Sequence, residues 1–162
     1  MTKIRSPQFG AILFRASELI GAQGAEVFDR LGISLNANKI SIVLALHAKG
    51  ALSSTELAQH IGVSRQLIES RLKSSVKDGF FISLPEPKDS RKRVYNISDD
   101  SRSEADRIVS IMKDFEHVYS TLWEEIGVEL EHALKLMERA LARKALTYRL
   151  CEDFPKYYDE IE

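Results

Sequence analysis

The sequence lacks most features that would place it outside the ordinary globular proteins. It has one cysteine among 162 residues, so no internal disulfide can form and a reducing compartment is expected. Its longest apolar runs, residues 10–14 and 42–46, are far shorter than the roughly 20 residues that cross a bilayer. No long apolar stretch follows the basic residues of the first ten positions, so no signal peptide is expected. We therefore predict a globular, cytoplasmic protein.

The sequence also lacks the residue sets that catalysis or metal binding requires. The four histidines form no pair at the spacing of zinc ligands and have no cysteine neighbour. Cys151 is followed by Glu152 and Asp153, whose negative charges disfavour a reactive thiolate. We find no glycine-rich phosphate loop and no pairing of a nucleophile with a base. We therefore expect no enzyme, no metal site and no cofactor.

Net charge is almost absent from the whole chain but not from its parts. The formal total is −1, which taken alone would argue against a polyanion as partner. Residues 1–52 and 53–97 each carry +3, whereas residues 98–162 carry −7. This partition favours a basic recognition face on an acidic scaffold. An uneven but functionless distribution of surface charge is the alternative.

Helical spacing of apolar residues dominates what is present. It predicts a first helix that ends near Gly32 and a second that Asn36 caps. Ser53 and Glu56 form the pattern of a capping box, in which each side chain accepts from the other residue's backbone. The short helix that follows is expected to end at Gly62. Ser64 then caps a fourth helix, which ends near residue 78.

The periodicity changes after this helix. Residues 80–84 favour a strand, residues 85–90 a turn, and residues 93–97 a returning strand, which together predict a β-hairpin. Ser101 and Glu104 form a second capping-box pattern, followed by a long helix up to Gly127. A further helical stripe runs from Leu130 to Tyr148, and a short acidic tail ends the chain.

Residues 54–73 have the pattern of a helix-turn-helix. The small Ala58 suits the place where two helices cross closely, and Gly62 supplies the left-handed turn between them. The inward positions of both helices are apolar. Arginine and glutamine on the outward face can make paired contacts with guanine and adenine in the major groove. A helical corner without a DNA partner is the alternative.

The hairpin that follows has a strongly basic tip, since four of the six residues 88–93 are Lys or Arg. Such a protrusion suits the negative potential of a minor groove, although a solvated charged turn would have the same composition. The predicted DNA contacts come from the second helix and the hairpin: Ser64, Arg65, Gln66, Glu69, Ser70, Lys73, Lys88, Asp89, Arg91 and Arg93.

These elements resemble the MarR family of bacterial transcriptional regulators over residues 5 to 150. The hairpin has that family's wing pattern, with Asp89 and Arg91 followed by Ile97 and Ser98. The resemblance implies that Asp89 orients Arg91, which enters the minor groove. Tyr95 stands where an aliphatic residue is usual. Ser75 stands in place of a common core leucine, and its neighbour Val76 is expected to compensate.

The resemblance also implies how the chain is organised. The fold is expected to be mainly α, a winged helix-turn-helix with a two-stranded β-wing and long N- and C-terminal dimerisation helices. Residues 1–32 would form the N-terminal dimerisation helix, residues 33–98 the DNA-binding domain, and residues 99–162 the C-terminal dimerisation helices and tail. A two-fold dimer places two recognition helices about one DNA turn apart, which predicts a palindromic site.

The expected function is that of a sequence-specific double-stranded DNA-binding transcriptional regulator, a ligand-responsive repressor that acts as a homodimer on a palindromic operator. The resemblance implies a small anionic or phenolic effector, for which Phe14, His47 and Phe115 are the candidate lining residues; ordinary core or rim positions are the alternative. The rival hypothesis is a dimeric winged-helix adaptor that binds proteins without specific DNA binding. The basic wing favours the regulator, because an adaptor has no need of it.

Overall fold

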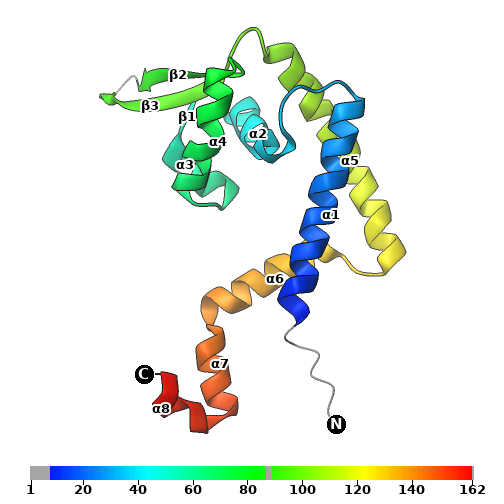
Figure 1. Ribbon diagram of the computed structural model, residues 1–162, viewed down its shortest axis with the longest axis vertical. Coiled ribbons are helices and arrows are strands. Elements are labelled where there is room, and N and C mark those ends of the chain that lie inside the picture. The colour runs from blue at the N-terminus through cyan, green and yellow to red at the C-terminus, as the bar shows by residue number, and fades with distance from the viewer. Residues whose placement is uncertain (1–7, 87–88, 162) are drawn as a thin grey trace. The chain divides into compact units, whose positions relative to one another are not determined.

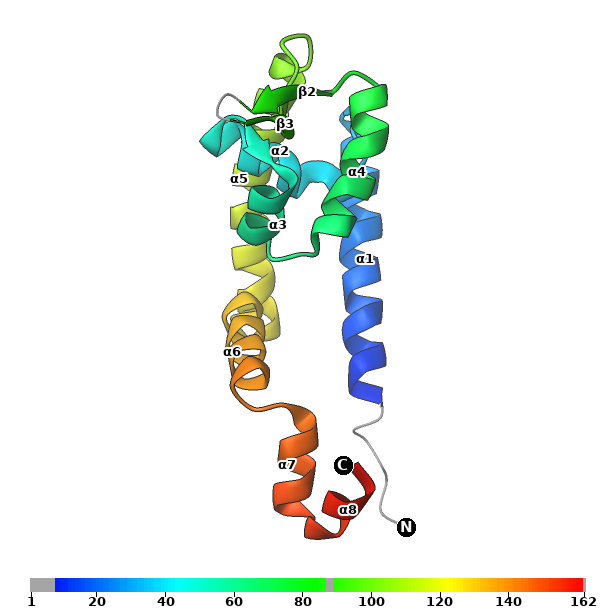
Figure 2. The ribbon, with the colours of Figure 1, turned by 90° about the vertical axis from the view of Figure 1, so that its left-hand side faces the viewer.

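The computed structural model describes residues 8–86 and 89–161. The chain divides into two compact units, Met1–Met112 and Lys113–Glu162, and helix α5 (Arg102–Ile126) runs from the first into the second. The first unit holds the predicted helix-turn-helix and hairpin (Figures 1 and 2).

The first unit begins with α1 (Phe9–Arg30), which ends where the sequence indicated, with Gly32 at a left-handed φ of 66°. The Asn36 side chain accepts a hydrogen bond from the Asn38 backbone N–H, as expected of a cap. It caps a single 3₁₀ turn, η2 (Ala37–Lys39), that leads into α2 (Ile40–Lys49).

The helix-turn-helix and the helix caps within it match the prediction. Helix α3 (Ser54–Ile61) begins with the capping box: the Ser53 hydroxyl accepts from the Glu56 N–H at 3.2 Å, and the Ser53 N–H donates to the Glu56 carboxylate at 2.8 Å. Helix α4 (Arg65–Lys77) is capped by Ser64, whose hydroxyl accepts from the Leu67 N–H at 3.2 Å.

The predicted second capping box is wrong. The Glu104 carboxylate accepts instead from the backbone N–H of Ser34 at 2.7 Å, from the Ser34 hydroxyl at 3.0 Å and from the Leu35 N–H at 3.2 Å. Two backbone donors of the loop after α1 thereby obtain a charged acceptor, which is a stronger arrangement than one local contact with Ser101. The Ser101 N–H donates to Ser98 instead.

The hairpin is present, but the sheet has three strands. Strands β2 (Phe81–Glu86) and β3 (Asp89–Ile97) pair antiparallel, with Phe81 opposite Ile97 and an irregularity between Pro85 and Glu86. The two-residue strand β1 (Leu52–Ser53) pairs with the other edge of β3, which gives the order β1-β3-β2. Strand β1 was not predicted because two residues are too few to show a period in the sequence.

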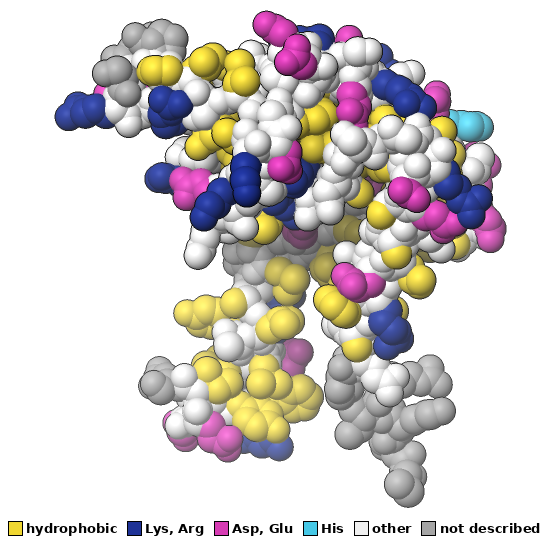
Figure 3. Space-filling model, turned by 45° about the horizontal axis from the view of Figure 1, so that its top comes forward, with side chains coloured by type: hydrophobic (Ala, Val, Ile, Leu, Met, Phe, Trp, Pro, Cys, Tyr) yellow, Lys and Arg dark blue, Asp and Glu magenta, His cyan; other side chains and the backbone are white. Residues whose placement is uncertain are grey.

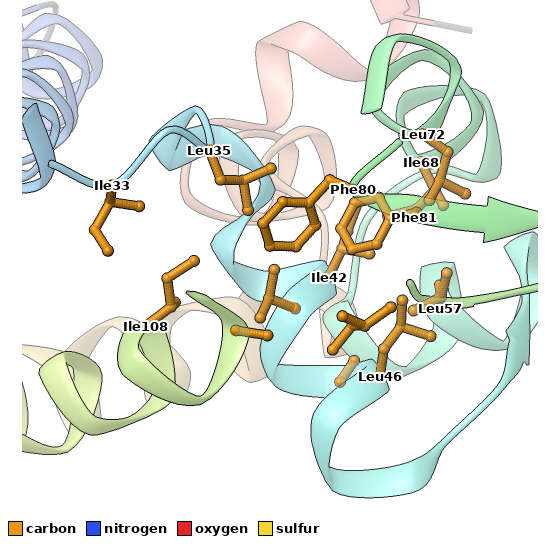
Figure 4. Close-up of a cluster of buried hydrophobic side chains, with 14 of the residues drawn as sticks. Ile33, Leu35, Ile42, Leu46, Leu57, Ile68, Leu72, Phe80, Phe81 and Ile108 are labelled. Atoms are coloured by element: carbon orange, nitrogen blue, oxygen red, sulfur yellow. The ribbon is translucent and has the colours of Figure 1, made fainter. Parts of the chain in front are cut away.

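One buried cluster holds these elements together. Ile42 and Leu46 of α2, Leu57 of α3, and Ile68 and Leu72 of α4 are all at most 1% exposed. Figure 4 shows them around the rings of Phe80 and Phe81 at the start of β2, with Ile33 and Ile108 at the α5 side. Helix α4 and the hairpin are therefore packed on the same core.

Ser75 lies in this core and is completely buried. It continues the inward stripe of Ile68 and Leu72, and its hydroxyl has no hydrogen-bond partner within the described residues. Its neighbour Val76 is half-buried and packs against the cluster, as expected. An apolar side chain at position 75 would avoid the cost of an unpaired buried hydroxyl.

The second unit differs from the prediction in the segment after Leu130. The predicted stripe from Leu130 to Tyr148 is broken into α6 (Leu130–Arg143) and α7 (Leu146–Asp153), with Lys144 in an extended conformation. The Arg149 guanidinium donates to the carbonyl oxygens of Ala140 and Lys144, which satisfies the end of α6 without a glycine or proline. The tail contains a 3₁₀ turn, η3 (Pro155–Tyr157), and a short helix, α8 (Tyr158–Ile161).

The capping box of α3 gives a test of stability. Ser53→Ala should lower the free energy of unfolding by about 1 kcal/mol, because it removes the side-chain acceptor of the first turn. Urea unfolding at pH 7 measures the change. Ser103→Ala, which removes an exposed hydroxyl in the first turn of α5, is the control and should have a smaller effect. Equal losses in the two variants would contradict the assignment.

The same box predicts a pH dependence. Hydrogen bonds from the Ser53 hydroxyl and backbone hold the pKa of Glu56 below its ordinary value of 4.5. The stabilisation is therefore complete above pH 4.5 and is lost as the pH falls through the lower folded-state pKa. Urea unfolding at a series of pH values measures the free energy of unfolding of the wild type and of Glu56→Gln. The difference between the two should shrink as the pH falls from 4.5 through the lower folded-state pKa of Glu56.

Candidate nucleic-acid interface

The turn between α3 and α4 has the conformation that the sequence indicated. Gly62 lies at φ 79° and ψ 31°, a left-handed conformation that costs a residue with a side chain about 1–2 kcal/mol. The N–H groups of Gly62 and Val63 both donate to the Ala58 carbonyl, at 2.9 and 3.1 Å. The closed turn places Ser64 at the N-cap of α4, so it determines which side chains α4 presents outward.

The outward face of α4 carries the predicted contact residues. Ile68, Leu72 and Ser75 form the buried stripe, whereas five of the predicted contact residues occupy exposed positions of the same helix. These are Arg65, Gln66, Glu69, Ser70 and Lys73, with Ser64 exposed at the helix N-terminus.

Glu69 is involved in hydrogen bonds of its own. One carboxylate oxygen accepts from Arg65 Nε at 2.7 Å and from the Ser54 hydroxyl at 3.2 Å. The hydrogen bond from Arg65 is the main cause that holds the pKa of Glu69 below its ordinary range, and the Ser54 hydroxyl lowers that pKa further. Glu69 is therefore ionised at neutral pH.

The wing contains the contact between Asp89 and Arg91 that the resemblance implied. The Asp89 carboxylate accepts from the Arg91 backbone N–H at 3.2 Å and from its Nε at 3.3 Å. The Arg91 side chain is 91% exposed, so its terminal nitrogens are accessible to a partner. Lys88, also a predicted contact, lies outside the described residues.

Arg93 is also bonded within the wing. Its Nε donates to the Ser83 hydroxyl at 3.0 Å, and one terminal nitrogen donates to the Ser83 carbonyl at 2.6 Å. Arg93 lies across β2, a contact that could not be predicted because it depends on the strand register.

A cleft of about 580 Å³ lies between the helix-turn-helix and the wing. It brings together Arg65 and Glu69 of α4 with Arg91 and Arg93 of the wing. Lys and Arg side chains gather over the hairpin and the helices beside it (Figure 3). The other residues that line the cleft were not predicted as contacts; they are Ser53, Ser54, Thr55, Glu56, Glu86, Lys92 and Tyr95. Two signals in the sequence could have indicated them. Lys92 belongs to the basic tip of the hairpin, and Ser53 and Glu56 form the capping box at the start of α3.

The three predicted effector residues have different surroundings. Phe14 of α1 is 66% exposed. His47 of α2 is bonded through Nε2 to the Asp106 carboxylate of α5 at 2.9 Å. Phe115 is half-buried, and its ring lies 5.9 Å from that of Tyr119.

Three further features concern the described part of the chain: metal-binding clusters, cysteine and membrane-spanning helices. Residues 8–86 and 89–161 hold no group of three acidic, histidine or cysteine side chains that could bind a metal ion. Cys151 is buried and unpaired. None of the helices in these ranges is long and apolar enough to cross a membrane.

Solved structures share this fold. CouR, a transcriptional repressor bound to a 23-mer DNA duplex, is 20% identical, with a TM-score of 0.62 over 87% of this chain and 99% of its own. A mutant MarR from E. coli, complexed with operator DNA, is 15% identical, with a TM-score of 0.61 over 87% and 94%. This chain has the MarR-type winged-helix fold. It matches no protein-family model and no curated protein.

The PcaV regulator from Streptomyces coelicolor, solved with its natural ligand, has a TM-score of 0.63 at 14% identity and covers 90% of this chain and 99% of its own. The MarR-type fold confirms the predicted fold class, with β1 added to the two strands of the wing. At these identities the likeness concerns the fold.

Proposed function

We propose that this protein is a sequence-specific double-stranded DNA-binding transcriptional regulator. The observation that carries the proposal is the cleft in which the outward face of α4 meets the basic wing. A helix fits the major groove of B-DNA, and a narrow basic hairpin fits the neighbouring minor groove. The DNA complexes of CouR and MarR, which have this fold, support the assignment.

The distribution of charge supports the same partner. Residues 1–52 and 53–97 each carry +3, whereas residues 98–162 carry −7. Basic side chains of residues 1–97 would release counterions from the DNA phosphates. The acidic helices of residues 98–162 would oppose indiscriminate coating of DNA. A protein-binding adaptor would not require this separation.

The regulator acts as a homodimer on a palindromic operator. Helix α1 exposes Phe9, Ile12, Phe14, Leu19 and Ile20, each between 43 and 66% accessible. The C-terminal unit likewise exposes apolar side chains of α6, α7 and the tail, including Leu136, Leu146, Tyr148 and Phe154. Apolar surface of this extent is typical of interfaces. A second copy of the chain is the proposed partner, with residues 1–32 and 99–162 as the dimerisation segments.

The sign of regulation and its trigger follow by analogy. We propose a repressor whose DNA affinity changes when a small anionic or phenolic effector binds near Phe14, His47 and Phe115. The support is the PcaV structure with its natural ligand. Such coupling requires the effector to bind one conformation more tightly than the other.

The function is tested by selecting binders from a random duplex pool and titrating the selected duplex against a scrambled one by fluorescence anisotropy. The selected sequence should be two-fold symmetric and bind at least about 10³-fold more tightly than the scrambled duplex at physiological salt. Both affinities should fall steeply with salt. Failure to discriminate the two duplexes would contradict a regulator and favour the adaptor.

Two substitutions should separate the roles of wing and helix. Arg91→Ala should weaken binding to selected and scrambled duplexes by similar factors and reduce the salt slope by about 1, because Arg91 is expected to neutralise backbone charge. Gln66→Ala should instead change the preferred base at one position in each half-site. Lys49→Ala, at an exposed position of α2 outside the cleft and the dimerisation segments, is the charge-matched control for Arg91→Ala. If Gln66→Ala leaves the selected sequence unchanged, α4 does not contact bases there.

A further inference from the structure

Glu69 is an unexpected residue on a surface that is proposed to face DNA. It lies on the outward side of α4, one helical turn after Arg65, and lines the cleft beside the basic wing. A carboxylate at this place is repelled by phosphate, so it weakens the attraction on which all duplex binding depends. Its presence therefore calls for a compensating role.

The contacts of Glu69 indicate that role. The carboxylate accepts from Arg65 Nε at 2.7 Å, which belongs to the same helix. It also accepts from the hydroxyl of Ser54, a buried residue at the start of α3, at 3.2 Å. The carboxylate is therefore bonded to both α3 and α4. Because its position is fixed by Ser54, it fixes the position of the Arg65 side chain in turn.

The bond through Nε leaves the useful edge of the guanidinium available. Arginine has five N–H donors, and only its Nε–H is engaged with Glu69. The terminal nitrogens of Arg65 donate no hydrogen bond within the described residues, and the side chain is 65% exposed. Two terminal nitrogens are what a bidentate contact with the O6 and N7 atoms of guanine requires.

We propose that Glu69 is a positioning residue, which holds Arg65 for contact with a base and makes binding selective. This inference rests on the proposed function. Holding the side chain in place before binding saves part of the conformational entropy that ordering it would cost. The negative charge meanwhile penalises every duplex, including those in which Arg65 finds no guanine. A penalty shared by all duplexes leaves the ratio of affinities unchanged, so the selectivity comes from the positioning of Arg65.

The experiment measures the ratio of affinities for the selected and scrambled duplexes in four variants: Glu69→Ala, Glu69→Gln, Arg65→Ala and the double variant of both alanines. Glu69→Ala removes acceptor and charge, whereas Glu69→Gln removes the charge and keeps an acceptor oxygen. Asp78→Asn is the charge-matched control, because Asp78 is exposed at the C-cap of α4 and lies outside both the cleft and the dimerisation segments. Thermal unfolding of each variant identifies losses that arise from misfolding.

We expect Glu69→Ala to bind the scrambled duplex more tightly than the wild type and to lower the ratio about two- to tenfold. Glu69→Gln should keep a ratio between those of Glu69→Ala and the wild type. Adding Glu69→Ala to Arg65→Ala should leave the ratio unchanged, because Glu69 acts through Arg65. Asp78→Asn should leave it unchanged as well.

Two results would overturn the inference. If Glu69→Ala raises both affinities by the same factor, Glu69 is an ordinary surface charge. If the double variant loses more selectivity than Arg65→Ala, Glu69 contacts a base itself. A wild type that does not discriminate the duplexes would instead refute the proposed function, so the two failures are distinguishable.

Discussion

The burial of one face of α4 determines how the helix-turn-helix and the wing present their outward side chains. Ile68 and Leu72 are at most 1% exposed and pack with Leu57 and Phe81 (Figure 4). A helix has 3.6 residues per turn, so fixing these positions inward fixes Arg65, Gln66 and Glu69 outward. The wing begins in the same core, because Phe80 and Phe81 lead directly into β2. Helix α4 and the wing are thus oriented by the same buried contacts.

Local patterns made much of this predictable from the sequence. The capping box at Ser53, the turn at Gly62 and the hairpin each depend on residues that are close together in the chain, and each is present. The contact of Asp89 with Arg91 is local too, and the resemblance implied it.

The parts that could not be predicted depend on contacts between distant segments. Glu104 has a local partner pattern, but it bonds to Ser34, 70 residues away, because that loop offers unpaired backbone donors. The predicted last long helix is broken after Arg143, where the sequence has neither the glycine nor the proline that usually marks a helix end. A carbonyl at the end of α6 accepts a hydrogen bond from Arg149 instead. Glu69 was predicted to contact DNA as an outward residue. Its bond to Ser54 depends on how α3 and α4 cross, which the sequence does not state.

Charge has two roles in the proposed function. The excess of Lys and Arg in residues 1–97 would attract any duplex, whereas the acidic C-terminal segment and Glu69 would weaken that general attraction. Negative charge near the proposed DNA surface would lower affinity in general, and Glu69 would add selectivity by holding Arg65 in place. A total charge of −1 is therefore compatible with a DNA partner, since the position of the charges decides the outcome.

Hydroxyl-radical and methylation footprinting on the selected duplex is the most direct test of the central claim, that α4 and the wing act together and in two copies. We expect two protected major-groove segments about one helical turn apart, each flanked by a protected minor groove. Continuous protection along the duplex, or a single protected segment without a symmetric partner, would contradict it.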